Sequence, residues 1–279
     1  AYDSSGNVYV VDSYDGRVLR FPSNATSSTN GVPVAGWGSS TAPGGGGPAY
    51  GSADNQLMFP SGVAVDSSDN LYVVDTSNSR IMRYTGAKTA TGPLTGTVFA
   101  GGNGAGSALN QLSAPQNAVI DGSGNLYVAD KGNQRVLKFP SNSTSSTDGV
   151  VVAGGNGTGD ALNQLRDPVD VAVDSSGNVL VLNAYARITS WAPGASTSSV
   201  IWGGDVRYTA GAAGSLVGAN SARGLAINPQ NSKVYAVSGG AFQIETTSYP
   251  RTCTLVPTPS NGPNYQCRIS YVPNLPFQD

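Results

Sequence analysis

Residues 60–84 read PSGVAVDSSDNLYVVDTSNSRIMRY, and this stretch recurs along the 279-residue chain. Close copies lie at 115–139 and 168–191, and a copy without its front part opens the chain at 1–21. A looser fifth copy covers 222–245. The Asn that opens the second run of the four clear copies recurs every 53 to 63 residues. A period of this length is typical of repeat architectures, so it guides the choice of fold.

Each copy contains four short apolar runs separated by turn residues. In the second copy the runs are Gly62–Val65, Leu71–Val74, Arg80–Tyr84 and Thr97–Ala100. They are too short for helices and rich in Val, Ile, Leu and Tyr, which predicts strands. Connections such as 66–70 (DSSDN) contain the Asp, Gly and Asn residues that tight turns require.

A unit of four strands cannot bury both of its faces alone, so the copies must stack face to face around an axis. The sequence therefore predicts an all-β fold, a β-propeller of four-stranded antiparallel blades. Five repeats are visible, which favours five blades, or six if the chain is a partial piece. Residues 1–279 are expected to form one domain.

The repeat also resembles a known family. Its pattern is Pro-x-x-[Val/Ala]-x-[Val/Ile]-Asp, then Asn-[Leu/Val]-Tyr-Val-x-Asp, then Asn-x-Arg-[Ile/Val]-x-[Arg/Lys]-[Phe/Tyr], and it is similar to the NHL repeat over roughly residues 1–247. The resemblance implies a propeller, most often six-bladed, and says little about function, because this fold serves receptors, RNA-binding regulators, extracellular sensors and a few enzymes.

The first copy lacks its inner strand, because Ala1 begins inside the repeat. We slightly favour closure within the chain, with the run 267–272 supplying the missing strand. Three alternatives remain: this run forms a hairpin with 251–257, residues before Ala1 supply the strand, or a neighbouring molecule donates it.

Composition excludes several functional classes. Only 11% of residues are charged and the net charge is −2, too little positive charge to attract nucleic acid or an anionic membrane surface. The chain has 15 Lys and Arg, which argues against the RNA-binding role of some NHL propellers. No apolar run approaches the ~20 residues that span a bilayer, so no membrane insertion is expected.

Two features indicate an extracellular protein. Cys253 and Cys267 lie in a Pro- and Asn-rich stretch, and a hairpin centred near Ser260 places their sulfurs opposite each other. We therefore predict a disulfide-closed C-terminal hairpin or closure segment at 248–279. Three sequons begin at Asn24, Asn142 and Asn156, and the first two occupy equivalent loops, which predicts glycosylation in a eukaryotic source.

The chain contains no histidine. Some NHL-type propellers are peptidylglycine-amidating lyases that depend on a histidine-bound zinc, and this sequence cannot supply that site. A Ser-His-Asp triad is excluded for the same reason. No catalytic residue and no resident cofactor are predicted.

Charged pairs recur once per copy. They are Asp12/Arg17, Asp75/Arg80 and Asp130/Arg135, with Asn183/Arg187 as a weaker version. Their regular spacing favours a structural role, in which each pair ties the end of the second strand to the third strand.

The residues that precede each inner strand are expected to line the mouth of a central channel. They are Gly62, Asn117, Asp170 and Gly224. Related lactonases and gluconolactonases hold calcium there with Asn, Asp and Glu oxygens. Here only Asn117 and Asp170 offer oxygen ligands, so a channel Ca²⁺ is a weak prediction.

The sequence favours a non-enzymatic extracellular binding or assembly module that contacts protein, glycan or identical copies of itself. The alternative is a calcium-dependent, lactonase-like hydrolase that uses Asn117 and Asp170. An intracellular RNA-binding regulator is disfavoured by the charge and by the predicted disulfide.

Overall fold

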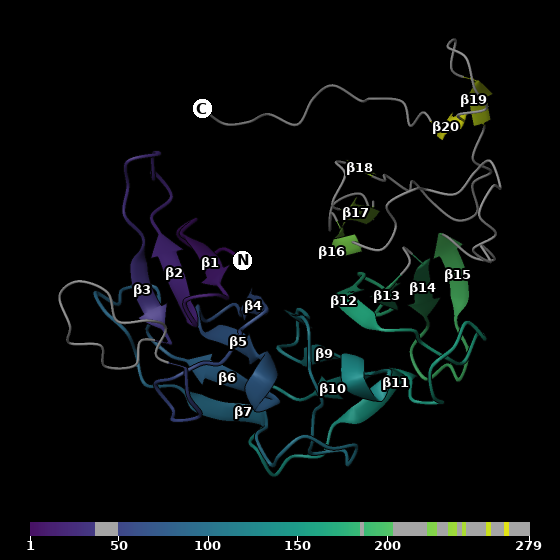
Figure 1. Cartoon of the computed structure of the whole chain (residues 1–279), viewed down its shortest axis with the longest axis horizontal. Helices are drawn as coiled ribbons and strands as arrows, with labels where there is room; N and C mark the ends of the chain where they lie inside the picture. Colours follow the sequence, from purple (N-terminus) through teal and green to yellow (C-terminus); the bar gives the residue numbers. More distant parts are fainter. Residues whose placement is uncertain are drawn as a thin grey trace.

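The computed structural model describes residues 1–36, 50–184 and 187–202, together with five strand segments nearer the C-terminus: 222–227, 234–238, 242–243, 255–257 and 265–267. These residues form a series of antiparallel sheets in chain order (Figure 1). None of the helices found in these residues is long and apolar enough to cross a membrane.

Five consecutive sheets form the blades. Blade 1 consists of β1 (Val8–Asp12), β2 (Arg17–Phe21) and β3 (Val32–Ala35). Blade 2 consists of β4 (Gly62–Val65), β5 (Leu71–Asp75), β6 (Arg80–Tyr84) and β7 (Thr97–Gly101). Blade 3 consists of β8 (Ala118–Ile120), β9 (Leu126–Asp130), β10 (Arg135–Phe139) and β11 (Val150–Gly154).

The remaining strands continue the series. Blade 4 consists of β12 (Pro168–Val173), β13 (Val179–Asn183), β14 (Arg187–Trp191) and β15 (Ser199–Trp202). Blade 5 contains β16 (Ala222–Ile227), β17 (Val234–Ser238) and β18 (Phe242–Gln243). The three-residue 3₁₀ turns η1 (Thr76–Asn78) and η2 (Lys131–Asn133) follow β5 and β9. The predicted strands of the second copy are thus confirmed to within one residue.

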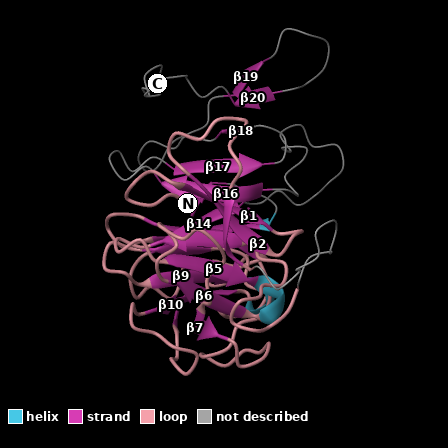
Figure 2. Cartoon of the chain, turned by 90° about the vertical axis from the view of Figure 1, so that its left-hand side faces the viewer, coloured by secondary structure: helices cyan, strands magenta, loops and turns pink. Residues whose placement is uncertain are grey.

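The blades stand side by side in an arc, with β4, β12 and β16 toward its centre and β7, β11 and β15 toward its periphery (Figure 1). Figure 2 shows from the side how the sheets stack. Neighbouring inner strands contact one another, as β4 does β8 and β12 does β16. This is the arrangement that the repeat predicted, a propeller of antiparallel blades.

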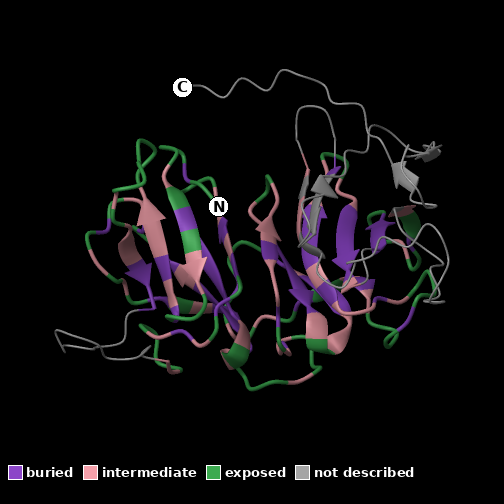
Figure 3. Cartoon of the chain, turned by 45° about the horizontal axis from the view of Figure 1, so that its top comes forward, coloured by how far each residue is buried: buried purple, intermediate pink, exposed green. Residues whose placement is uncertain are grey.

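The core is divided into layers between successive blades, which appear as the buried segments of Figure 3. Every residue of β5 is buried. Leu71 and Val73 pack toward blade 1, whereas Tyr72 and Val74 pack toward blade 3. Successive side chains of a strand point to opposite faces, so a strand covered on both faces must be apolar at every position.

The ends of the series bear on how the ring closes. In the described residues β1 pairs with β2, and toward the axis it has only an isolated bridge between Tyr2 and Val8. Strand β20 (Tyr265–Cys267) pairs with β19 (Leu255–Pro257). Of the run 267–272 only Cys267 belongs to the described residues, so which segment supplies the inner strand of blade 1 stays a prediction. Residues 268–279 lie outside the described residues.

The hairpin register differs from the expected one. Leu255, not Cys253, lies opposite Cys267, so the turn is shifted from the centre near Ser260. Cys253 and the Cys267 side chain lie outside the described part of the chain. The disulfide therefore stays a prediction.

Candidate functional site

The charged pair of blade 2 is buried beside the loop that leads into the blade. The Arg80 guanidinium donates from Nε to Asp75 Oδ2 over 2.7 Å. Its Nη atoms donate to the backbone carbonyls of Ser52, Ala53 and Gln56. The pair therefore joins the second and third strands to the entering loop.

Blade 3 repeats this arrangement. Arg135 Nε donates to Asp130 Oδ2 over 2.8 Å, and its Nη atoms donate to three carbonyls of the loop before the blade, those of Ser107, Ala108 and Gln111. Burial raises the pKa of both Asp75 and Asp130, and hydrogen bonds from the surrounding donors offset part of that effect. These carboxylates are thus committed to contacts within the chain.

The equivalent groups of blades 1 and 4 differ. Arg17 pairs with Asp12 at 3.0 Å, and the two side chains are 27% and 28% exposed. In blade 4 the acid is replaced by Asn183, whose Oδ1 accepts from the backbone N–H of Arg166. Arg187 lies 3.7 Å from Asp160. The electrostatic contribution of this pair to stability therefore differs between blades, although the strands are arranged in the same way.

The face of the propeller that carries these pairs also has a row of polar contacts, which crosses from one inner strand to the next. Asn117 Nδ2 donates to Asp170 Oδ1 over 2.6 Å, from blade 3 to blade 4. Asp170 Oδ2 accepts from the backbone N–H of Leu225 over 2.6 Å, which extends the row to blade 5. Toward blade 2, a Cβ added to Gly62 would lie 2.2 Å from Asn117 Oδ1, so a side chain there would displace the Asn117 amide. The structure thus brings Asn117 and Asp170 together.

Asp170 is 3% exposed, and burial raises its pKa to about 6 against the opposing effect of its hydrogen-bond donors. Oδ1 also accepts from the backbone N–H of Val171 over 2.8 Å. Both oxygens needed for a metal thus already accept hydrogen bonds. In the described part of the chain, no cluster of three or more His, Cys, Asp or Glu side chains is placed to hold a metal. The two predicted ligands fit a link between blades better than a calcium site.

The opposite face carries the turns between the first and second strands. In blade 3, Asp121 Oδ1 accepts from the backbone N–H groups of Ser123 and Asn125, both at 2.9 Å. Oδ2 accepts from Asn125 Nδ2 at 2.8 Å and from the Tyr127 hydroxyl at 3.1 Å. Burial alone would raise the pKa of Asp121, but these hydrogen bonds outweigh it and lower the pKa.

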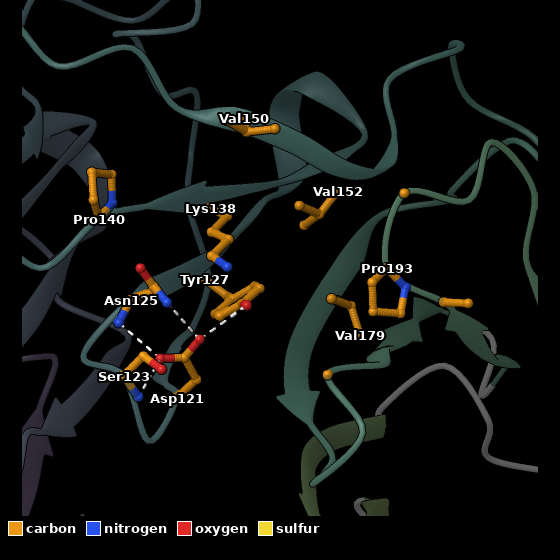
Figure 4. Close-up of a pocket in the computed structure, with 13 residues that line it drawn as sticks. Asp121, Ser123, Asn125, Tyr127, Lys138, Pro140, Val150, Val152, Val179 and Pro193 are labelled. Atoms are coloured by element: carbon orange, nitrogen blue, oxygen red, sulfur yellow. Dashed lines mark hydrogen bonds between the residues drawn. The ribbon is translucent and has the colours of Figure 1, made fainter.

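A groove opens on this face between blades 3 and 4 (Figure 4). Its volume is about 640 Å³. Tyr127 and Lys138 lie on the blade 3 side, with Val179 and Pro193 across from them on blade 4 (Figure 4). The Lys138 ammonium lies 5.3 Å from the centre of the Tyr127 ring.

The corresponding place between blades 2 and 3 is filled by aromatic and basic side chains. Phe99 is 1% exposed and meets Tyr72 edge to face, with ring centres 5.0 Å apart. The Arg83 guanidinium lies 5.9 Å from the centre of the Phe99 ring. The strand registers align Phe99 with Val152 and Arg83 with Lys138. The smaller Val152 leaves space where the other blade is packed.

Between blades 1 and 2 the same face is bridged by polar contacts. Asp69 accepts from the backbone N–H and the hydroxyl of Ser4, at 2.8 and 2.7 Å. Lys88 Nζ lies 2.8 Å from Asp69 Oδ2. Blade 4 has Gly177 at the position of Asp69, so it cannot form this bridge.

Lys138, Val152 and Val179 were not predicted from the sequence as functional residues. A signal was present, because aligning the copies sets Val152 against Phe99 and Val179 against Leu126. Both changes remove volume from facing strands of the same interface. The sequence alone does not say whether other side chains move in to fill the space.

The predicted glycosylation sites lie in loops. Asn24 and Asn142 are exposed and occupy equivalent β2–β3 and β10–β11 connections. Asn156 is also exposed, and its amide donates to the Asn163 carbonyl over 2.9 Å.

Comparisons with known proteins agree with this architecture. Residues 57–84 match the family model of the NHL repeat. A search of the curated proteins found no match. Similar solved structures include a chain of a nidogen/laminin complex, with 15% identity over 85% of this chain and 73% of that chain and a TM-score of 0.54.

Two enzymes share the fold. A gluconolactonase from Xanthomonas campestris is 14% identical over 85% of this chain and 67% of that chain, with a TM-score of 0.54. Virginiamycin B lyase from Staphylococcus aureus is 10% identical over 85% of this chain, with a TM-score of 0.51, and this chain spans only 61% of its length. At these identities the likeness establishes architecture alone. The chain therefore contains an NHL repeat at residues 57–84 and has the fold of a β-propeller.

Proposed function

We propose that this chain is a non-enzymatic binding module that acts outside the cell and contacts protein or glycan. The observation that carries the proposal is the hydrogen bonding of Asp170, the acid that the calcium-dependent alternative would need as a metal ligand. It accepts hydrogen bonds from Val171, Asn117 and Leu225 and joins blades 3, 4 and 5. A carboxylate held in this way supports the ring rather than a reaction.

The recurring acids support the same proposal. Asp75 and Asp130 are fully buried and bonded to Arg80 and Arg135. Asp121 accepts two hydrogen bonds on each oxygen inside a turn. Open space occurs instead in the groove between blades 3 and 4, where the walls are mostly apolar.

The fold comparison with a chain of a nidogen/laminin complex adds an example of a similar propeller in a protein complex. An extracellular location is supported by the exposed loop positions of Asn24 and Asn142. The predicted bond between Cys253 and Cys267 belongs to the same proposal, because disulfides persist in oxidising compartments.

The rival is a calcium-dependent hydrolase with its metal at Asn117 and Asp170. Titration of the full chain with CaCl₂ by calorimetry, followed by assays on a panel of sugar lactones, separates the two. We expect no saturable calcium binding at the axis and no hydrolysis above background. Calcium-dependent hydrolysis that Asp170→Asn abolishes, in a variant that still folds, would overturn the proposal.

The binding function itself is tested on a glycan array and on immobilised extracellular matrix proteins, with heat-denatured chain as control. Saturable binding by the native form is expected. Asp75→Asn is a matched variant for this assay, since it should weaken folding without changing the affinity of the folded fraction.

A further inference from the structure

The groove between blades 3 and 4 has a chemical character of its own. We propose that it binds a small organic anion, one carboxylate carried on an apolar body. The inference deepens the proposed binding function and rests on it, because it names a ligand class for one place on the module.

The space comes from two departures from the repeat. Val152 stands where Phe99 fills the neighbouring cleft, and Val179 stands where Leu126 does. The rest of the interface stays packed, with Ala153 2% exposed. The resulting volume of about 640 Å³ lies within the range of small-molecule sites, about 300 to 1,000 Å³.

The positive group is Lys138. Its ammonium lies 5.3 Å from the centre of the Tyr127 ring, and no carboxylate in the described part of the chain forms an ion pair with it. Asp121 also lines the groove. Its two oxygens accept hydrogen bonds from Ser123, Asn125 and Tyr127 inside the turn. Lys138, which also contacts Tyr127, is the one cation among the residues that line the groove, and its remaining N–H groups are the charged donors for a ligand.

The walls select an apolar body. Val150 is 61% exposed, and together with Val152 it forms the outer side of the groove. On the facing side Pro193 supplies the exposed surface, beside Val179, which is only 3% exposed (Figure 4). The Tyr127 ring is only 4% exposed, so it offers little face for stacking a sugar. Apolar side chains that surround one cation favour a hydrophobic acid over a polyol.

The probe pair is 2-naphthylacetate and its uncharged analogue 2-naphthylacetamide, titrated into the full chain by calorimetry. The acid should bind at least about tenfold more tightly than the amide, because it gains a charge-assisted hydrogen bond to Lys138. Raising the NaCl concentration should narrow this difference. Equal affinity for the two probes, or no binding of either, would overturn the inference.

Two variants locate the site. Val152→Phe restores the residue found at Phe99 and should abolish binding of both probes by filling the groove. Lys138→Gln should reduce the affinity for the acid about tenfold and leave the amide unchanged. Val151→Phe is the matched control, because Val151 is exposed on the same strand and does not line the groove.

Thermal melts monitored by circular dichroism establish that each variant is folded before it is titrated. Unchanged acid binding in folded Lys138→Gln and Val152→Phe would overturn the assignment. The experiments can reject the groove inference and the proposed binding function independently of each other. If the acid does not bind but lactones are not hydrolysed, the groove inference fails and the binding module stands, whereas Asp170-dependent hydrolysis rejects the module whatever the probes show.

Discussion

At the scale of single residues, equivalent Asp–Arg pairs contribute differently to the free energy of unfolding in different blades. Arg80 and Asp75 are 6% and 0% exposed at the side chain, while Arg17 and Asp12 are 27% and 28% exposed. Removing one member of a buried pair leaves an uncompensated charge in a medium of low dielectric. An exposed pair is solvated and screened, so its loss costs little.

We therefore predict that Arg80→Met lowers the free energy of unfolding by about 3–5 kcal/mol. Arg17→Met, the matched control in blade 1, should cost no more than about 1 kcal/mol. Urea denaturation followed by tryptophan fluorescence measures both. Equal losses of unfolding free energy in the two variants would contradict the prediction that burial makes the Arg80–Asp75 pair more important for stability.

Asp170 gives the stability a pH dependence of a defined sign. Its pKa is raised by burial from 3.8 to about 6 in the folded chain, so the native state holds the proton more tightly than the unfolded state. The stabilisation is fully present below pH 4 and is lost as the pH rises through about 6. The loss amounts to roughly 3 kcal/mol.

The test compares the full chain with Asp170→Asn, which has no proton to lose at that position. Between pH 4 and pH 7, the free energy of unfolding of the full chain should fall relative to that of the variant. Acids with lowered pKa, such as Asp3 and Asp121, act in the opposite direction at lower pH and cancel in this difference. Parallel curves for the two proteins would refute the assignment.

At the scale of the elements, the turn between the first and second strands acts as a small hydrogen-bonded unit. In blade 2, Asp66 Oδ1 accepts from the backbone N–H groups of Ser68 and Asn70, and Oδ2 accepts from the Asn70 amide and the Tyr72 hydroxyl. One carboxylate thus satisfies the turn and fixes the start of β5. The residue types were evident from the sequence, because Asp and Asn favour such turns.

We predict that Tyr72→Phe costs about 1 kcal/mol, the net value of one hydrogen bond. Asp66→Ala should cost about 2 kcal/mol or more, because it leaves several donors without an acceptor. Loss of the hydroxyl in Tyr72→Phe should be tolerated, because blade 4 has Leu180 at the position equivalent to Tyr72. Thermal unfolding of both variants checks the order, and a larger loss for Tyr72→Phe would contradict it.

At the scale of the whole molecule, nearly identical blades are stacked, and the interfaces between them are not identical. The face that carries the turns is bridged by Asp69 and Lys88 between blades 1 and 2, filled by Phe99 between blades 2 and 3, and open between blades 3 and 4. Repetition provides the stacked blades, and departures from it make the interfaces between them differ.

The proposed location makes a prediction for the whole chain. Expressed through a eukaryotic secretory pathway, it should carry glycans at Asn24 and Asn142, and single Asn→Gln variants should each lose one glycan by intact-mass spectrometry. Maleimide labelling before and after reduction reports the Cys253–Cys267 bond. Unmodified asparagines together with two reactive thiols would argue against an extracellular protein.

The strands and their blades were predictable from the sequence because their causes are local. Short continuous apolar runs define β5 and β9, and Asp-x-x-x-Asn turns separate them from the strands before. The Asn117–Asp170 contact was anticipated as a position but not as a bond, because the two residues are 53 apart and meet only when blades pack. The groove could not be predicted, because the free volume between two blades depends on how the surrounding side chains pack, and the sequence does not record this.

By itself, the sequence determined the repeat, the fold of each blade and the recurring pairs, since these depend on contacts within about fifty residues. Only the tertiary structure decided that Asp170 accepts hydrogen bonds from the neighbouring blades, that Lys138 lines a groove, and that β20 pairs with β19. The physical reason is that burial and free volume belong to interfaces between units. Because the units are nearly identical, a few differing side chains determine how each interface packs, and the periodic pattern does not predict their packing.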